Sequence, residues 1–180
     1  MRTVDQAYRA FHYVKFAGLL LSGTTIFFMM AFIVIDVVTR NLMGSSVFGS
    51  YEITQYFLMP LAFFPALAYA YGSGIMPKLE MLTNRLKPVM RRNIAILMMG
   101  IELVLFSLLT FYGWQYALSG TREQLGFSMK GGIVTYYPIL YFIPLGFLLL
   151  SIEILFLIIK SFGQKEPVLE TKLETTEVEA

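Results

Sequence analysis

The sequence contains no cysteine and only one histidine, His12. The absence of cysteine excludes disulfide bonds, thiolate metal sites and thiol redox chemistry. A four-helix membrane cytochrome needs paired axial haem ligands inside its bundle, commonly two histidines. His12 lies near the N-terminus, outside the long apolar segments, so a haem-binding membrane protein is disfavoured. No nucleophile–base arrangement and no phosphate-binding glycine loop stands out, and we therefore expect neither an enzyme nor a bound cofactor or metal.

Charged residues are also scarce. They make up 14% of the 180 residues, whereas 57% are hydrophobic. Charged residues make up about a quarter of an ordinary soluble domain, so this chain has too little polar surface to cover a core in water. The net charge of +2 comes without a basic stripe interleaved with exposed aromatic residues, and nucleic-acid binding is not expected. The composition indicates a membrane protein.

Four apolar stretches are long enough to cross a membrane. A transmembrane helix needs roughly 20 predominantly apolar residues. The stretches cover residues 16–35, 53–71, 94–118 and 134–159. The first has too long an apolar run for a signal peptide and no small-residue cleavage site after it. The predicted fold class is an all-α integral membrane protein with four transmembrane helices and short interfacial amphipathic helices.

The distribution of lysine and arginine predicts the orientation of these helices. Eleven of the fourteen basic residues lie before the first span, between the second and third spans, or after the fourth. The other two connections carry only Arg40, Arg122 and Lys130. By the positive-inside rule, both termini and the middle connection are expected in the cytoplasm.

Three segments flank the spans. Residues 1–15 carry an apolar stripe at helical spacing and predict an N-terminal interfacial amphipathic helix. A second cytoplasmic amphipathic helix is expected at about 77–87, because leucines recur there helically after Pro77. Residues 161–180 are rich in glutamate and are expected to be a disordered cytoplasmic tail. The charged candidates for the cytoplasmic interface are Lys78, Glu80, Arg85, Arg91 and Arg92.

Three charges lie where the first two spans meet. Asp36 and Arg40 are four residues apart at the outer end of the first span, so they share one helix face. Glu52 begins the second span, where an acid is favoured by the exposed backbone amides. These charges could simply satisfy one another at the membrane boundary, or they could form an outer-face surface for a partner protein.

Two acids lie within the third and fourth spans. Glu102 is about 13 Å past Asn93 along its helix, and Glu153 is about 10 Å before Lys160, so both have a similar depth. Intramembrane acids are costly and are candidates for function. The spans contain no basic residue that would pair with them, which favours contacts with a partner helix. A proton- or cation-coupled site is the other interpretation.

These features resemble the small membrane (Q) subunit of TRAP transporters, the tripartite ATP-independent periplasmic carriers. The segment "DVVTRNLMGSSVFGSYEITQY" has the family's Asp-x-x-x-Arg at the end of the first span and its Glu at the start of the second, here Asp36, Arg40 and Glu52. The run "GIMPKLEML" matches through Leu79, Glu80 and Leu82, but Met76 and Pro77 replace the usual His-Ile. The segment "YYPILYFIPLGFLLL" resembles the family's fourth span.

The resemblance implies a function that composition does not show. A Q subunit is a non-catalytic scaffold for a large multi-span M subunit, which holds the sodium and substrate sites. A periplasmic binding protein delivers an organic acid, such as sialic acid or a C4-dicarboxylate. Membrane lipids would be the remaining partners. Two other classes stay open: a self-sufficient small carrier that uses Glu102 and Glu153, and a membrane anchor for a redox or signalling enzyme.

Overall fold

The computed structural model describes residues 2–45, 47, 49–73, 88–129 and 132–162. Four of its helices are long and apolar enough to cross a membrane: Tyr8–Met43, Ser50–Gly72, Asn93–Arg122 and Tyr137–Ile159. The expectation of four transmembrane helices is therefore confirmed. The expected helix at 77–87, with Lys78, Glu80 and Arg85, lies outside the described residues, as does most of the tail. Arg91 and Arg92 lie in a helix, but their side chains are outside the description.

The first span is one continuous helix, α1 (Arg2–Met43). Its 42 residues correspond to roughly 63 Å, about twice the thickness of a hydrocarbon core. The segment expected as a separate interfacial helix over residues 1–15 thus runs into the span without a break. The helix ends at Gly44, whose positive φ of 69° suits a glycine, and whose N–H donates to the carbonyl of Arg40.

The second span is irregular. It consists of α2 (Ser50–Ile53), a π turn (Thr54–Leu58), α3 (Met59–Phe63), a 3₁₀ turn (Phe64–Ala66) and α4 (Leu67–Gly72). Pro60 follows the π turn and Pro65 lies in the 3₁₀ turn, as expected for a residue that cannot donate a helix hydrogen bond. Ser22 of α1 donates to the carbonyl of Leu61, the acceptor that Pro65 leaves free in a regular helix.

The 3₁₀ turn lies tightly between two glycines of neighbouring helices. A Cβ at Gly18 of α1 would clash with the carbonyl oxygen of Pro65, and one at Gly146 of α7 (Phe142–Phe162) would clash with Phe64. These glycines let both helices approach the irregular segment closely. They fix the second span between α1 and α7.

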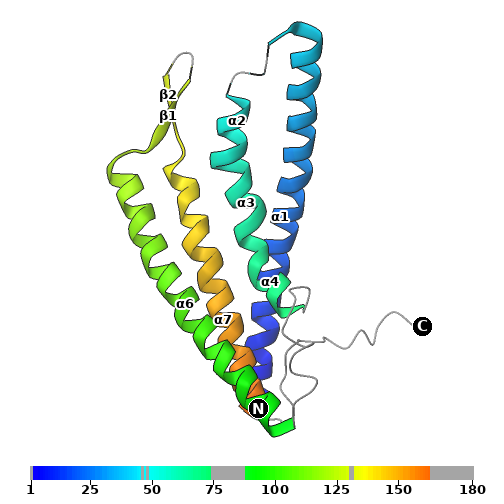
Figure 1. The fold of residues 1–180 in the computed structure, drawn as a ribbon, viewed down its shortest axis with the longest axis vertical. Coiled ribbons are helices and arrows are strands. Elements are labelled where there is room, and N and C mark those ends of the chain that lie inside the picture. Colours follow the sequence, from blue (N-terminus) through cyan, green and yellow to red (C-terminus); the bar gives the residue numbers. More distant parts are fainter. Residues whose placement is uncertain (1, 46, 48, 74–87, 130–131, 163–180) are drawn as a thin grey trace, which may run out of the picture.

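The four spans lie side by side in a row (Figure 1). Helix α1 packs on the second span, the second span packs on α7, and α7 packs on α6 (Pro88–Arg122). The helices approach one another at the end that carries the N-terminus, which we call the N-terminal end. The buried apolar core lies there between α4, α6 and α7. It consists of Leu67, Tyr71, Ala95, Met99, Leu150, Ile154 and Leu157.

A β-hairpin occupies the opposite end, which we call the hairpin end (Figure 1). Strands β1 (Gly126–Met129) and β2 (Gly132–Thr135) pair antiparallel, with Phe127 opposite Val134. This hairpin was not expected from the apolar pattern, which placed the start of the fourth span at Val134. The structure places Val134 in β2, and helical structure begins with a 3₁₀ turn at Tyr137–Tyr141.

Candidate functional site

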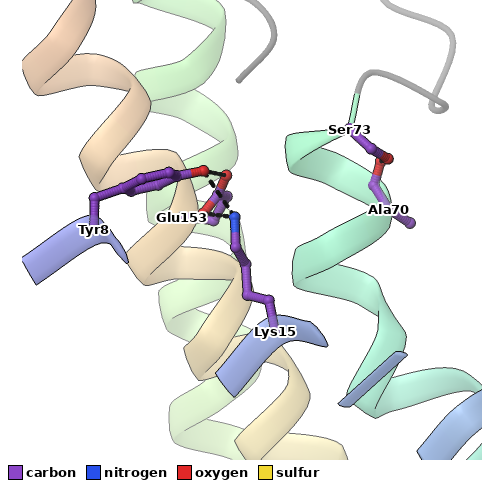
Figure 2. Close-up of polar contacts among 5 residues, drawn as sticks. All are labelled: Tyr8, Lys15, Ala70, Ser73 and Glu153. Carbon is purple, nitrogen blue, oxygen red and sulfur yellow. Dashed lines mark hydrogen bonds and ion pairs between the residues drawn. The ribbon is translucent and has the colours of Figure 1, made fainter. Parts of the chain in front are cut away.

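A buried polar cluster joins the first and last spans at the N-terminal end. The ammonium group of Lys15 on α1 lies 2.7 Å from Oε2 of Glu153 on α7. It also donates a hydrogen bond of 2.8 Å to the hydroxyl of Tyr8, which lies about two turns earlier on the same helix. That hydroxyl donates to Oε1 of Glu153 at 3.0 Å. Figure 2 shows both α1 side chains directed toward Glu153, and each member contacts the other two.

Both charges of this cluster are removed from solvent. Lys15 is 2% exposed and Glu153 is 0% exposed. Isolated charges would be very costly here, so the pairing and the Tyr8 hydroxyl are what make burial tolerable. The nitrogen of Lys15 also lies 4.7 Å from the ring centre of Tyr8 and 5.5 Å from that of Phe11. The aromatic rings therefore enclose the cation on its α1 side.

Lys15 corrects one expectation from the sequence. We expected Glu153 to need a basic group from a partner, because no lysine or arginine lay within the four stretches. That expectation is wrong, since α1 extends well before residue 16 and carries Lys15 to the depth of Glu153. The signal was present: Tyr8, Phe11 and Lys15 are spaced at three and four residues and share one face of a helix.

Gly72, at the C-terminal end of α4, lies against this cluster. A Cβ at this position would clash with Oε1 of Glu153 and lie 3.1 Å from the Lys15 nitrogen. The chain then turns, with the N–H of Ser73 donating to the carbonyl of Tyr69 and its hydroxyl to that of Ala70. The second span therefore ends directly on the ion pair, and three spans meet at one point.

The second intramembrane acid, Glu102, belongs to the same end. The hydroxyl of Tyr71 on α4 donates a short hydrogen bond to Oε2 of Glu102 on α6. Glu102 is half-buried, and no lysine or arginine side chain in the described part of the chain forms an ion pair with it. The two acids therefore have different partners: Glu153 forms an ion pair within this chain, whereas Glu102 accepts a hydrogen bond from Tyr71.

At the hairpin end, Asp36 closes the connection between the first two spans. Its carboxylate accepts a hydrogen bond of 2.7 Å from Arg40 and another of 2.7 Å from the backbone N–H of Val47. The side chain of Asp36 is 9% exposed, whereas that of Arg40 is 62% exposed. Glu52 lies in the first turn of α2, as expected, but it takes part in neither ion pair found among the described residues.

The hairpin adds an aromatic cluster that the sequence analysis did not identify. Tyr56 of the second span stacks on Phe127 of β1 and on Tyr136, with ring centres 5.9 and 4.4 Å apart. Phe57 meets Phe127 edge-on. Burial among these rings raises the pKa of the Tyr136 phenol. The hairpin is therefore held on the second span by side chains at least 70 residues apart in sequence.

The site does not have the composition of a metal centre. Among residues 2–45, 47, 49–73, 88–129 and 132–162, no three His, Asp or Glu side chains gather closely enough to hold an ion. The chemistry available to the buried cluster is electrostatic and structural: a neutralised ion pair, a phenol and a glycine that together connect three spans.

The sequence matches the family described as tripartite ATP-independent periplasmic transporters, DctQ component, over residues 29–163. The match covers well over half of the chain and includes the four spans apart from the part of α1 before residue 29. The chain belongs to the DctQ family. No curated protein and no solved structure gives a match. As a DctQ component, it is a small, multi-pass membrane subunit of a TRAP transporter, and the resemblance to that family is confirmed.

The DctQ family match begins at residue 29 and therefore does not include Tyr8 or Lys15. Glu153, Gly72 and Glu102 lie within it. The family thus provides no information about the α1 half of the buried cluster, which is known only from the structure of this chain.

Proposed function

We propose that this DctQ component is the non-catalytic scaffold subunit of a sodium-driven TRAP transporter in a bacterial inner membrane. The family match carries the proposal. The arrangement of the spans supports it, because all four helices lie side by side and polar contacts also join α1 to α7 and α4 to α6. A scaffold needs this kind of rigidity, since a moving partner must work against a fixed surface.

The large M subunit would bind sodium and the substrate, and this chain would bind neither. A periplasmic binding protein would deliver an organic acid of the sialic acid or C4-dicarboxylate class. Asp36, Arg40 and Glu52 would strengthen the periplasmic face near the docking position of that protein. Arg40 is the best placed of the three for a contact, because its side chain is largely exposed while Asp36 holds it.

The orientation belongs to the same proposal. The N-terminal end would face the cytoplasm, with Lys78, Glu80, Arg85, Arg91 and Arg92 near the lipid headgroups. The basic residues would favour anionic lipid on that side.

The self-sufficient carrier is less well supported by the geometry. Such a carrier would use Glu102 and Glu153 to bind a proton or cation. Glu153 already binds Lys15 and Tyr8 and is fully buried, so it is not available to a transported cation without breaking both contacts.

Reconstitution tests the scaffold proposal. Liposomes would contain this chain alone, the large subunit alone, or both, with the binding protein added outside. Uptake of labelled sialic acid and labelled succinate would be measured with and without an inward sodium gradient. We expect sodium-dependent uptake of one substrate class only when both membrane subunits are present. Uptake by this chain alone would support the carrier instead, and a large subunit fully active alone would contradict the scaffold role.

A further inference from the structure

Glu102 has an unusual environment for an acid in a membrane span. It is the tenth residue of the span that begins at Asn93, which places it roughly 13 Å along the helix. The hydrocarbon region cannot solvate a carboxylate, so such a group needs a partner. Tyr71 supplies one hydrogen bond to Oε2, yet the side chain remains partly exposed and forms no ion pair within the described residues.

The exposed side of Glu102 continues as an apolar strip along α6. Met98, Glu102, Leu105 and Leu109 follow one another at spacings of four, three and four residues, which places them on one side of the helix. We call these four residues the Glu102 seam. Its three apolar members are exposed. Side chains at this spacing form the contact face along which two helices pack together.

Helix α6 also lies at one edge of the row. Its main packing is against α7 and the 3₁₀ turn before it, so much of its remaining surface is uncovered (Figure 1). Helix α1 forms the other edge, and three of its charged residues, Lys15, Asp36 and Arg40, have ion-pair partners within this chain. Among the described side chains, Glu102 on the α6 edge is thus an intramembrane acid that no ion pair neutralises.

We propose that the Glu102 seam is the surface that docks on a transmembrane helix of the large subunit, and that this helix presents a lysine or arginine opposite Glu102. This inference rests on the scaffold function proposed above. Charge complementarity selects the partner: a cation on the opposing helix neutralises Glu102, and the three apolar residues bury surface around the pair. Lipid tails would satisfy the apolar residues but not the carboxylate.

The test uses the purified complex of both membrane subunits in mild detergent. Glu102→Gln removes the charge and keeps the shape, and Leu109→Trp adds bulk within the seam. Each has a matched control. Glu123→Gln makes the same change at an exposed acid beyond the end of α6. Leu118→Trp changes a leucine that is as exposed as Leu109 but nine residues along, on the opposite side of the helix.

We expect Glu102→Gln and Leu109→Trp each to lower the affinity for the large subunit by about tenfold or more, the scale of a lost charge-assisted hydrogen bond. The two controls should keep wild-type affinity. A photo-crosslinker at position 105 should react with the large subunit, and one at position 118 should not. Wild-type affinity for both seam variants overturns the inference, as does crosslinking at 105 only to a second copy of this chain or to lipid.

Two measurements separate the possible failures. If the wild-type chain recovers no large subunit, the scaffold function itself fails, and the docking inference fails with it. If Glu102→Gln lowers the thermal stability of the isolated subunit but leaves the complex intact, Glu102 has an internal role, and the docking inference alone is wrong. Reduced affinity with unchanged stability of the isolated subunit supports both.

Discussion

The two ion pairs found among the described residues illustrate opposite relations between sequence and structure. Asp36 and Arg40 are four residues apart on one helix, and Arg40 is largely exposed. Lys15 and Glu153 are 138 residues apart, lie on the first and last spans, and are both buried. The first pair can be read from spacing alone. The second exists only because the fold brings the first and last spans together.

The difference matters for stability more than for geometry, since both pairs have a nitrogen–oxygen distance of 2.7 Å. A solvated pair four residues apart contributes only about 0.2–0.5 kcal/mol. Removing one partner of a buried pair costs about 3–5 kcal/mol, because the other charge remains buried and unpaired. Equal distances therefore conceal very different energetic consequences.

The largest effect is expected from breaking the buried pair. Glu153→Gln should lower the free energy of unfolding in detergent by about 3–5 kcal/mol, because Lys15 would remain charged and buried. Lys15→Met should have a similar effect through the unpaired carboxylate. The double variant Lys15→Met/Glu153→Met should recover most of the loss, since neither charge remains. Unfolding with a detergent denaturant measures all three.

The double variant makes this prediction specific. If each single variant costs little, or if the losses in the double variant simply add, the two residues do not act as one buried pair. Tyr8→Phe provides a graded comparison, because it removes one hydroxyl from both partners and leaves the ion pair in place. Its cost should be about 0.5–1.5 kcal/mol.

The second effect concerns the glycine that lies against this pair. Gly72→Leu should destabilise the protein by about 1–3 kcal/mol through overpacking, because the new side chain would displace the Glu153 carboxylate. Gly23→Leu is the matched control, since a Cβ at Gly23 would meet no atom within 4 Å. Thermal unfolding of both variants checks the prediction, and equal midpoints would contradict the close approach of α4 to the ion pair.

These residues also show what the sequence could and could not reveal. Four spans, the Asp36–Arg40 spacing and the position of Glu52 depend on local patterns of apolarity and charge, and the structure contains them. The partner of Glu153 depends on which helices become neighbours, and on α1 extending as a regular helix back to Arg2. The apolar stripe over residues 1–15 indicates a helix there, but no local pattern shows that this helix continues into the first span or that α1 and α7 become neighbours.

The hairpin was missed for a related physical reason. Its strands have only four residues each, and the apolar residues of β2 join the apolar start of the fourth span without interruption. Their pairing is supported by Tyr56 and Phe57 from the second span, which are distant in sequence. The irregular turns at Pro60 and Pro65, in contrast, follow from the chemistry of proline itself.

An effect of similar size is expected at Asp36. Asp36→Ala removes the acceptor for both Arg40 and the Val47 N–H, and should cost about 1–3 kcal/mol because a charged acceptor is lost at a helix connection. Asp36→Asn keeps an oxygen that can accept from Val47 and should cost less. Chemical or thermal unfolding of the two variants separates the contribution of the hydrogen bond to Val47 from that of the ion pair with Arg40. Equal losses would mean that the negative charge, rather than the bond to Val47, is what stabilises this region.

The smallest effect on stability is expected at Arg40. Its side chain is largely exposed, so Arg40→Ala should change the free energy of unfolding by less than about 0.5 kcal/mol. This small cost makes Arg40 a good probe of function, because altered uptake cannot then be attributed to unfolding. If Arg40 contacts a partner at the hairpin end, Arg40→Glu should lower uptake by the reconstituted transporter, while Arg122→Glu at the end of α6 serves as a control for charge alone. Unchanged uptake and unchanged complex yield would limit the Asp36–Arg40 pair to closing its own loop, and leave the buried Lys15–Glu153 pair as the one that organises the scaffold.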